Sequence, residues 1–409
     1  MALQETAAAP ARPHIEHTVF AVIAAVSLGH LLNDLMQSLI PAVYPLLKKA
    51  LALSFGQIGL VTLVFQGTAS ILQPLVGLYT DRRPLPYAMA FGMASTLAGL
   101  VLLAHATSFV PVLAAVALIG LGSSIFHPES SRIAWLAAGM RPGFAQSFFQ
   151  VGGNVGSSLG PLLAAFIVLP NGQQSLQWFA GVALIGMAVL TAVGNWYRRE
   201  GKHRAAARQV RIAGFSLPRR TVNMALAILI ALMFSKFVYL ASFSSYYTFY
   251  LIERYGVAVT TAQIGLFVFL ACVAAGTIAG GPIGDRIGRK RVIWVSILGV
   301  FPFAMALPFA GFEANVVLAG LSGAVLASAF PAMIVYAQEL VPSKVGMIAG
   351  LFFGFAFGMG GMGAAAIGVI ADASSMTRAY EFCSFLPLLG LLAFFLPDTH
   401  REAPATAMT

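Results

Sequence analysis

The chain has 409 residues, of which 59% are hydrophobic and only 9% are charged, and its mean hydropathy is +0.85. Soluble domains carry roughly 25% charged residues, so this chain has too few to cover a water-facing surface. The net charge of +10 does not indicate a nucleic-acid partner, because the basic residues lie in short clusters between apolar runs and no zinc-finger spacing accompanies them. Lipid is therefore the expected surroundings of most of the chain.

Apolar runs dominate the chain from its first quarter to its end. A membrane-spanning helix needs roughly 20 mostly apolar residues. Such runs are predicted at 18–46, 54–79, 88–107, 109–136, 143–169, 175–197, 221–251, 261–284, 291–311, 314–341, 346–371 and 377–397. The predicted organisation is a tail (1–16), a six-helix bundle (17–197), a basic linker (198–220), a second six-helix bundle (221–397) and a second tail (398–409).

The distribution of basic residues predicts the orientation in the membrane. With the N-terminus inside, 19 of the 24 Lys and Arg residues fall on the inner side and four on the outer side, and Lys236 lies within a helix. Loops on the cytoplasmic side carry such an excess. We therefore expect a multi-pass membrane protein with both termini in the cytoplasm.

The two predicted bundles share an internal repeat at an offset of 204 residues. The offset relates three pairs of identical residues around one loop of each half: Gly77 and Gly281, Asp81 and Asp285, and Arg82 and Arg286. Parallel repeats of this kind are a known transporter architecture, in which the substrate site lies between the halves near the bilayer midplane.

The second copy of the repeated loop carries the more complete motif. Residues 281–290 form a Gly-x-x-x-Asp-Arg-x-Gly-Arg-Lys pattern, which resembles the loop motif of the major facilitator superfamily. In the first copy, Arg83-Pro84-Leu85-Pro86 replaces the Gly-Arg-Lys end. The resemblance implies an all-α membrane protein of 12 transmembrane helices in two pseudo-symmetric six-helix bundles. The loop charges are expected to form a cytoplasmic gate: Asp81, Arg82, Asp285, Arg286 and Arg289.

Several other segments resemble a narrower branch, the fosmidomycin resistance protein family. They are residues 30–34 (HLLND), 124–132 (SIFHPESSR), 150–154 (QVGGN), 234–236 (FSK), 244–247 (SSYY) and 352–358 (FFGFAFG). The resemblance implies export of a small anionic drug such as fosmidomycin across the bacterial inner membrane, in exchange for protons and by alternating access. The alternatives are a proton-coupled or facilitative transporter of an endogenous metabolite, a membrane-embedded enzyme, and a receptor that does not transport.

Candidate proton-coupling residues are ionisable groups within predicted spans, where each costs at least about 2.5–3.5 kcal/mol at the helix centre. His30 and Asp34 stand at i and i+4, so they share one face of the first helix. Desolvation favours the protonated form of such a carboxyl, and a neighbouring imidazole can share its proton. Glu129, in the fourth helix, is the third candidate. The alternative for His30 and Asp34 is a buried pair that holds helices together, and for Glu129 it is a cluster whose charges reach the membrane interface.

Candidate substrate-binding residues are polar groups on the faces of the fourth, fifth and seventh helices. Lys236 lies too deep in its helix to reach the interface easily, so it needs an anionic partner or a substrate anion. Six further residues are predicted to bind substrate: Arg132, His127, Gln150, Asn154, Tyr239 and Tyr246. Glycines 152, 156 and 160 of the fifth helix predict close helix packing instead.

The sequence gives no sign of an enzyme or of a bound cofactor. It has no catalytic grouping, no P-loop to hold nucleotide phosphates and no zinc-ligand spacing, so we expect neither ATP nor a metal, and a proton gradient as the energy source. The two cysteines, Cys272 and Cys383, lie in apolar stretches and predict no disulfide framework. The expected partners are a small-molecule drug, protons and membrane lipid, and a monomer is expected.

Overall fold

The computed structural model describes residues 17–43, 46–47, 50–53, 55–213 and 218–397. Over these residues the chain consists of helices and turns and contains no strand. The predicted tails at 1–16 and 398–409 lie outside the described residues.

The first bundle contains the helices of the N-terminal half. They are α1 (Phe20–Ala42), α3 (Phe55–Arg82), α4 (Ala88–Ala104), α5 (Phe109–Ala137), α6 (Pro142–Leu163), η1 (Ala164–Val168), α7 (Leu169–Asn171), η2 (Gln173–Phe179) and α8 (Ala180–Ala213). The short π-helical turn η1 extends α6, and η2 leads directly into α8.

The second bundle contains the helices of the C-terminal half. They are α9 (Arg219–Tyr255), α10 (Val259–Ile287), α11 (Arg289–Leu298), α12 (Phe301–Ala306), η3 (Leu307–Phe309), α13 (Phe312–Ala327), α14 (Ala329–Leu340), η4 (Pro342–Lys344), α15 (Val345–Ala373), α16 (Met376–Cys383) and η5 (Leu386–Phe395).

The helices agree with the predicted membrane spans. Among the described residues, nine helical stretches are long and apolar enough to cross a membrane. Helices α3 and α6 and the shorter apolar α4 occupy the places of the other three predicted spans. The described helices are therefore consistent with twelve spans in two halves.

Several predicted spans are interrupted where the sequence carries glycine or proline. The span predicted at 291–311 divides at Gly299 into α11 and α12, and α12 has Pro302 in its first turn. In the span predicted at 377–397, α16 ends at Cys383 and the 3₁₀ helix η5 begins at Leu386, with Pro387 in its first turn. Proline lacks the N–H that a continuous α-helix needs, so these breaks follow from the local sequence.

The glycine of the second loop motif has a conformational role. Gly288 separates α10 from α11 at φ +92°, a backbone conformation that residues with a Cβ rarely adopt. It allows the chain to reverse between two spanning helices while Arg289 and Lys290 begin the next one.

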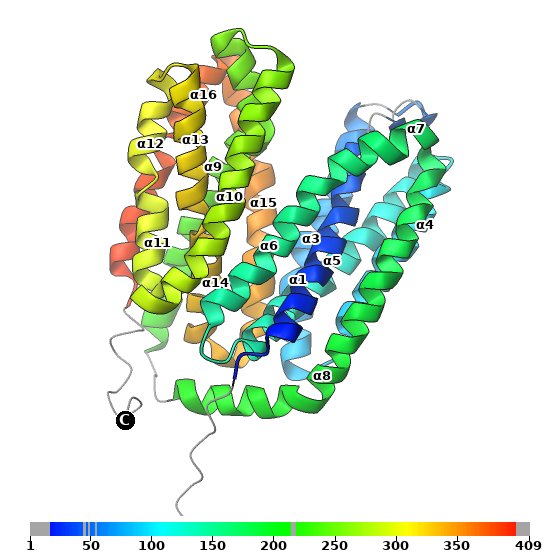
Figure 1. The fold of residues 1–409 in the computed structure, drawn as a ribbon, viewed down its shortest axis with the longest axis vertical. Coiled ribbons are helices and arrows are strands. Elements are labelled where there is room, and N and C mark those ends of the chain that lie inside the picture. Colours follow the sequence, from blue (N-terminus) through cyan, green and yellow to red (C-terminus); the bar gives the residue numbers. More distant parts are fainter. Residues whose placement is uncertain (1–16, 44–45, 48–49, 54, 214–217, 398–409) are drawn as a thin grey trace, which may run out of the picture.

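The two bundles meet at one end of the molecule and diverge at the other (Figure 1). The end where they meet is the one at which α8 ends and α9 begins, and we call it the linker side. The larger cluster of buried apolar side chains fills the N-terminal bundle and continues into α11, α14 and α15. A second cluster, around Phe243, Tyr247 and Phe269, lies wholly within the C-terminal bundle.

The linker begins as a helix. Helix α8 continues through the basic stretch to Ala213, and its last part runs across the linker side beneath the bundles (Figure 1). The predicted linker at 198–220 is therefore helical over most of its length, although residues 214–217 lie outside the described chain.

Candidate functional site

A cavity lies between the two bundles, with about 770 Å³ of space free of protein atoms, part of it open to solvent. Both halves contribute to its wall. Its polar and charged lining residues are His30, Asp34, His127, Gln150, Asn154, Ser157, Lys236 and Thr277. Six of the ten residues predicted for proton coupling and substrate binding therefore share one cavity.

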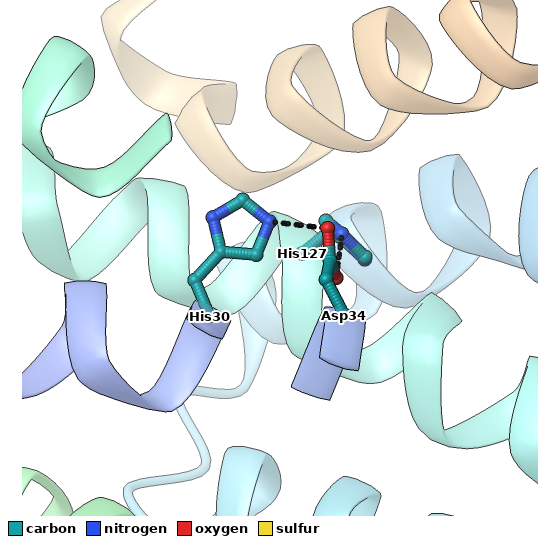
Figure 2. Close-up of side chains that lie close together, drawn as sticks. All are labelled: His30, Asp34 and His127. Atoms are coloured by element: carbon teal, nitrogen blue, oxygen red, sulfur yellow. Dashed lines mark ion pairs between the residues drawn. The ribbon is translucent and has the colours of Figure 1, made fainter. Parts of the chain in front are cut away.

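Asp34 lies at the centre of a buried group with two histidines (Figure 2). Its Oδ2 is 3.2 Å from His30 Nε2, and its Oδ1 is 3.4 Å from His127 Nε2. Both imidazoles are only 1% exposed, whereas the Asp34 side chain is 14% exposed towards the cavity that it lines. Asn33 Nδ2 also donates to Asp34 Oδ1, at 3.0 Å. We call His30, Asp34 and His127 the triad.

Backbone carbonyls fix the orientation of both imidazole rings. His30 Nδ1 lies 2.8 Å from the Phe149 carbonyl oxygen, and His127 Nδ1 lies 3.0 Å from the Ser123 carbonyl oxygen. A carbonyl oxygen only accepts, so each Nδ1 carries a hydrogen and each Nε2 is the atom presented to Asp34. In a neutral imidazole with its hydrogen on Nδ1, Nε2 can only accept a hydrogen bond, and the Asp34 carboxylate can also only accept. The contact between Nε2 and the carboxylate oxygen therefore becomes favourable when a proton is bound between these two atoms.

Close packing of α6 on α1 positions His30 and Asp34 of the triad. Glycines 152, 156 and 160 lie against the α1 backbone or Ser38, where an added Cβ would collide. At Gly153 a Cβ would strike the His30 ring. The small residues of α6 thus allow the two helices to approach closely and leave room for the imidazole.

The opposite half also contacts the triad. The rings of Phe353 and Phe357, on α15, lie with centroids 5.1 and 5.6 Å from that of His127. A movement of α15 relative to the N-terminal bundle would therefore change the surroundings of this imidazole directly.

Lys236 supplies the positive charge of the cavity. Its side chain on α9 is buried, and its Nζ lies 5.3 and 5.2 Å from the ring centroids of Phe237 and Phe330. Among the described residues, no acidic side chain lies within 4.0 Å of this ammonium group. Aromatic faces stabilise a cation only in part. An anion entering the cavity would therefore find a charge without an ionic partner.

The polar side chains of α6 extend the cavity wall. Gln150 and Asn154 both line it, and Asn154 Nδ2 lies 3.4 Å from Thr277 Oγ1 on α10, in the opposite half. These groups offer hydrogen bonds to a ligand between the bundles.

Glu129 and Arg132 lie away from the cavity. They form a buried pair with 2.5 Å between Arg132 Nη2 and Glu129 Oε2. Arg132 Nη1 also donates to the Thr80 carbonyl oxygen at 3.3 Å, and its guanidinium lies 5.1 Å from the ring centroid of Tyr197. In this conformation the pair belongs to the linker-side end of the N-terminal bundle, and the expectation that Arg132 meets substrate has no support from its position.

The predicted tyrosines are also placed outside the cavity lining. Tyr239 is 2% exposed and packs against Phe243 in the core of the C-terminal bundle, with ring centroids 5.3 Å apart. Tyr246 is half-buried beside the same apolar cluster. Their helix α9 presents Lys236 and Leu240 to the cavity instead.

The predicted gate residues Asp81 and Asp285 join the halves at the linker side. Asp81 accepts hydrogen bonds from the backbone N–H groups of Gly346 and Met347, both at 2.9 Å. These amides belong to the first turn of α15, where unpaired N–H groups and the helix dipole favour a carboxylate.

The second half repeats this contact. Asp285 accepts from the N–H groups of Gly143 and Phe144, in the first turn of α6, at 2.9 and 3.0 Å. Beside the two carboxylates, Gly77 and Gly281 lie against the backbones of Gly346 and Gly143, where a Cβ would collide. The internal repeat read in the sequence is thus a pair of equivalent contacts that close the linker side.

The three predicted gate arginines differ in position. Arg289 is buried and binds Asp285 at 2.9 Å and Glu339 at 3.4 Å. Arg82 and Arg286 are exposed, and among the described residues neither forms a salt bridge.

A family model described as "Major Facilitator Superfamily" matches residues 26–275 and 250–408. The chain belongs to the major facilitator superfamily. It is 54% identical over 399 residues, 98% of each chain, to the "Fosmidomycin resistance protein" of Escherichia coli (strain K12). It is 42% identical over 392 residues, 94% of each chain, to the "Uncharacterized MFS-type transporter YfnC" of Bacillus subtilis (strain 168).

Solved transporters of the superfamily share the fold. The crystal structure of FucP in the outward conformation superposes with a TM-score of 0.72 at 16% identity, over 92% of this chain and 99% of that one. The predicted fold class and both resemblances are therefore confirmed, and the chain is a multi-pass membrane protein of a transporter superfamily.

Sequence reasoning missed much of the apolar wall of the cavity. Phe237, Phe330, Phe353 and Phe357 face the charged groups from the C-terminal half. Within an apolar helix a phenylalanine at a cavity and one facing lipid look alike. The phenylalanine–glycine run at 352–358 is the signal that could have found two of them, because it interrupts an otherwise aliphatic span.

Proposed function

We propose that the protein exports a small anionic drug, fosmidomycin or a similar compound, in exchange for protons by alternating access. The observation that carries the proposal is the presence of Lys236 and the Asp34 triad in one cavity between the halves. Lys236 offers a cation to the drug, and the triad offers a site for a proton. The name of the Escherichia coli relative supports the drug.

The closed linker side supports assigning this conformation to the outward-open state of the transport cycle. Asp81 and Asp285 hold the bundles together there, while the bundles diverge at the opposite end (Figure 1). We infer that this state is open to the outside, releases the drug and takes up a proton at Asp34.

The return step follows from charge balance. When the linker side opens, the drug binds at Lys236 and the proton leaves Asp34 on the cytoplasmic side. The drug anion then carries its negative charge outward as the proton carries its positive charge inward. Each charge moved is worth about 2.3 kcal/mol per 100 mV, so both movements are favoured by a potential that is negative inside.

The location and partners follow from the same reasoning. We propose a monomer in the bacterial inner membrane, in contact with membrane lipid. The excess of Lys and Arg residues on one side favours a cytoplasmic position for both termini and for the basic linker. The proton gradient is the proposed energy source, with no cofactor and no chemical change of the drug, so the protein is proposed to be a transporter and not an enzyme.

Transport in inverted membrane vesicles tests the function. An interior-acid gradient should drive accumulation of labelled fosmidomycin by the wild type. At drug concentrations well below saturation, Lys236→Gln should lower this accumulation by at least about 10-fold. Arg220→Gln, which removes a charge from the exposed start of the same helix, should leave it unchanged. Accumulation that is the same with and without the gradient, or that is unchanged in Lys236→Gln, would refute the proposal.

Tolerance measurements in cells test the substrate. Overexpression of the wild type should raise fosmidomycin tolerance, and deletion of the gene should lower it. Unchanged tolerance in both strains would refute the proposal that fosmidomycin is a substrate.

A further inference from the structure

The triad has the composition and spacing of a metal site that short motifs in the sequence do not reveal. His30 and Asp34 come from α1 and His127 from α5, and their ligand atoms all lie within 4.8 Å of one another. The sequence predicted no metal because no zinc-ligand spacing occurs in one segment. The fold assembles these donors from two helices.

The distances suit a tetrahedral ion. With Zn–ligand bonds of roughly 2.0–2.1 Å, two ligand atoms of a tetrahedral zinc lie about 3.3 Å apart. The two Asp34–histidine pairs lie at 3.2 and 3.4 Å, each through a different oxygen of the carboxylate, and ligand atoms taken one per residue all lie within 4.8 Å of one another. Small side-chain movements would bring all three donors onto one ion.

The hydrogen bonds of the rings prepare both histidines as ligands. Each Nδ1–H donates to a backbone carbonyl oxygen, which leaves each Nε2 lone pair directed at the centre of the triad. Histidines that bind metals almost always donate their other ring N–H in this way. Both Nε2 atoms are buried. Each lies opposite an Asp34 carboxylate oxygen, and among the described residues neither meets a hydrogen-bond donor.

The donor types select the class of ion. Two imidazoles favour zinc and its transition-metal neighbours over Mg²⁺ and Ca²⁺, which prefer an all-oxygen shell. We propose that His30, Asp34 and His127 bind one divalent transition-metal cation of the Zn²⁺ class, with its fourth position facing the cavity. Lys236 is the other charged residue in the cavity lining, and its repulsion makes the site weaker than a structural zinc site.

Metal titration of the purified, untagged full chain in detergent tests the inference. Calorimetry with Zn²⁺, after chelator treatment, should show one site per chain, and Mg²⁺ should give no matching signal. His127→Ala should weaken Zn²⁺ binding by at least about 10-fold. His105→Ala, at an exposed histidine bonded to Gln177, should bind as the wild type does. Unchanged affinity in His127→Ala would overturn the proposal.

A second measurement does not depend on the folding of a variant. X-ray absorption of the wild type loaded with one equivalent of Co²⁺ should show two imidazoles and oxygen ligands. Sulfur ligation, or a shell without imidazole, would overturn the proposal. Both assays use neither a gradient nor a drug, so their outcome is independent of whether the transport proposal holds.

Discussion

Asp81→Asn is expected to open the linker side. The Asp81 carboxylate accepts two backbone N–H groups from α15, both at 2.9 Å. Hydrogen bonds to charged groups contribute about 1.5–3 kcal/mol each, and neutral ones about 1 kcal/mol. Asparagine keeps one neutral acceptor, so the closed state loses about 2–5 kcal/mol. The ratio of closed to open molecules should therefore fall by about 30- to 4,000-fold.

Spin-label distances can measure this change. One pair of labels, at Arg83 and Ile287, reports on the linker side, and a second pair, at Thr107 and Glu313, reports on the opposite end; all four side chains are exposed. In a background without native cysteines, Asp81→Asn should lengthen the first distance and shorten the second. Unchanged distributions in both pairs would refute the reasoning.

Three further outcomes follow from the site. Asp34→Asn should leave a protein that binds drug but does not couple its movement to a proton gradient, measured as gradient-driven uptake in vesicles. Lys236→Gln should weaken drug binding by about 10- to 150-fold, measured by calorimetry, because it removes one charge-assisted contact. The control Tyr239→Phe, at a residue outside the cavity lining, should bind the drug as the wild type does. Gly77→Val should clash with the Gly346 backbone and cost the closed state about 1–3 kcal/mol, measured with the same spin labels.

The sequence was sufficient for the fold because the membrane imposes simple rules. Long apolar runs and a repeated loop motif predicted the spans and the two halves, and both follow from the need to satisfy backbone groups inside lipid. The places where the helices break were less predictable. Gly299 and Pro387 interrupt predicted spans, yet Pro128 lies within the continuous helix α5. Whether a proline ends a helix depends on its neighbours as well as on its own chemistry.

The site was predictable residue by residue but not as a group. The cost of a charge in lipid singles out Asp34 and Lys236 from the sequence alone, and both line the cavity. The same reasoning predicted functional roles for Glu129 and Arg132, which pair with each other away from the cavity. The free-energy cost of burying a charge indicates that the charge needs a partner, but the identity of that partner can be read only from the folded structure.

The position of His127 shows the same limit. The sequence predicted it to bind substrate as a polar group of the fourth helix, and the fold places its Nε2 beside Asp34 on α1. Helix periodicity relates residues on one helix, whereas a contact between α5 and α1 depends on how the helices pack.

Proton release on drug binding tests the exchange most directly. Purified protein in weakly buffered detergent solution is mixed with fosmidomycin, and the change in pH is recorded with a buffer of matched drug content as the blank. The wild type should release protons as it binds the drug, and Asp34→Asn should bind without release. A wild type that binds fosmidomycin and releases no proton at any pH would contradict the exchange of drug and proton in this cavity.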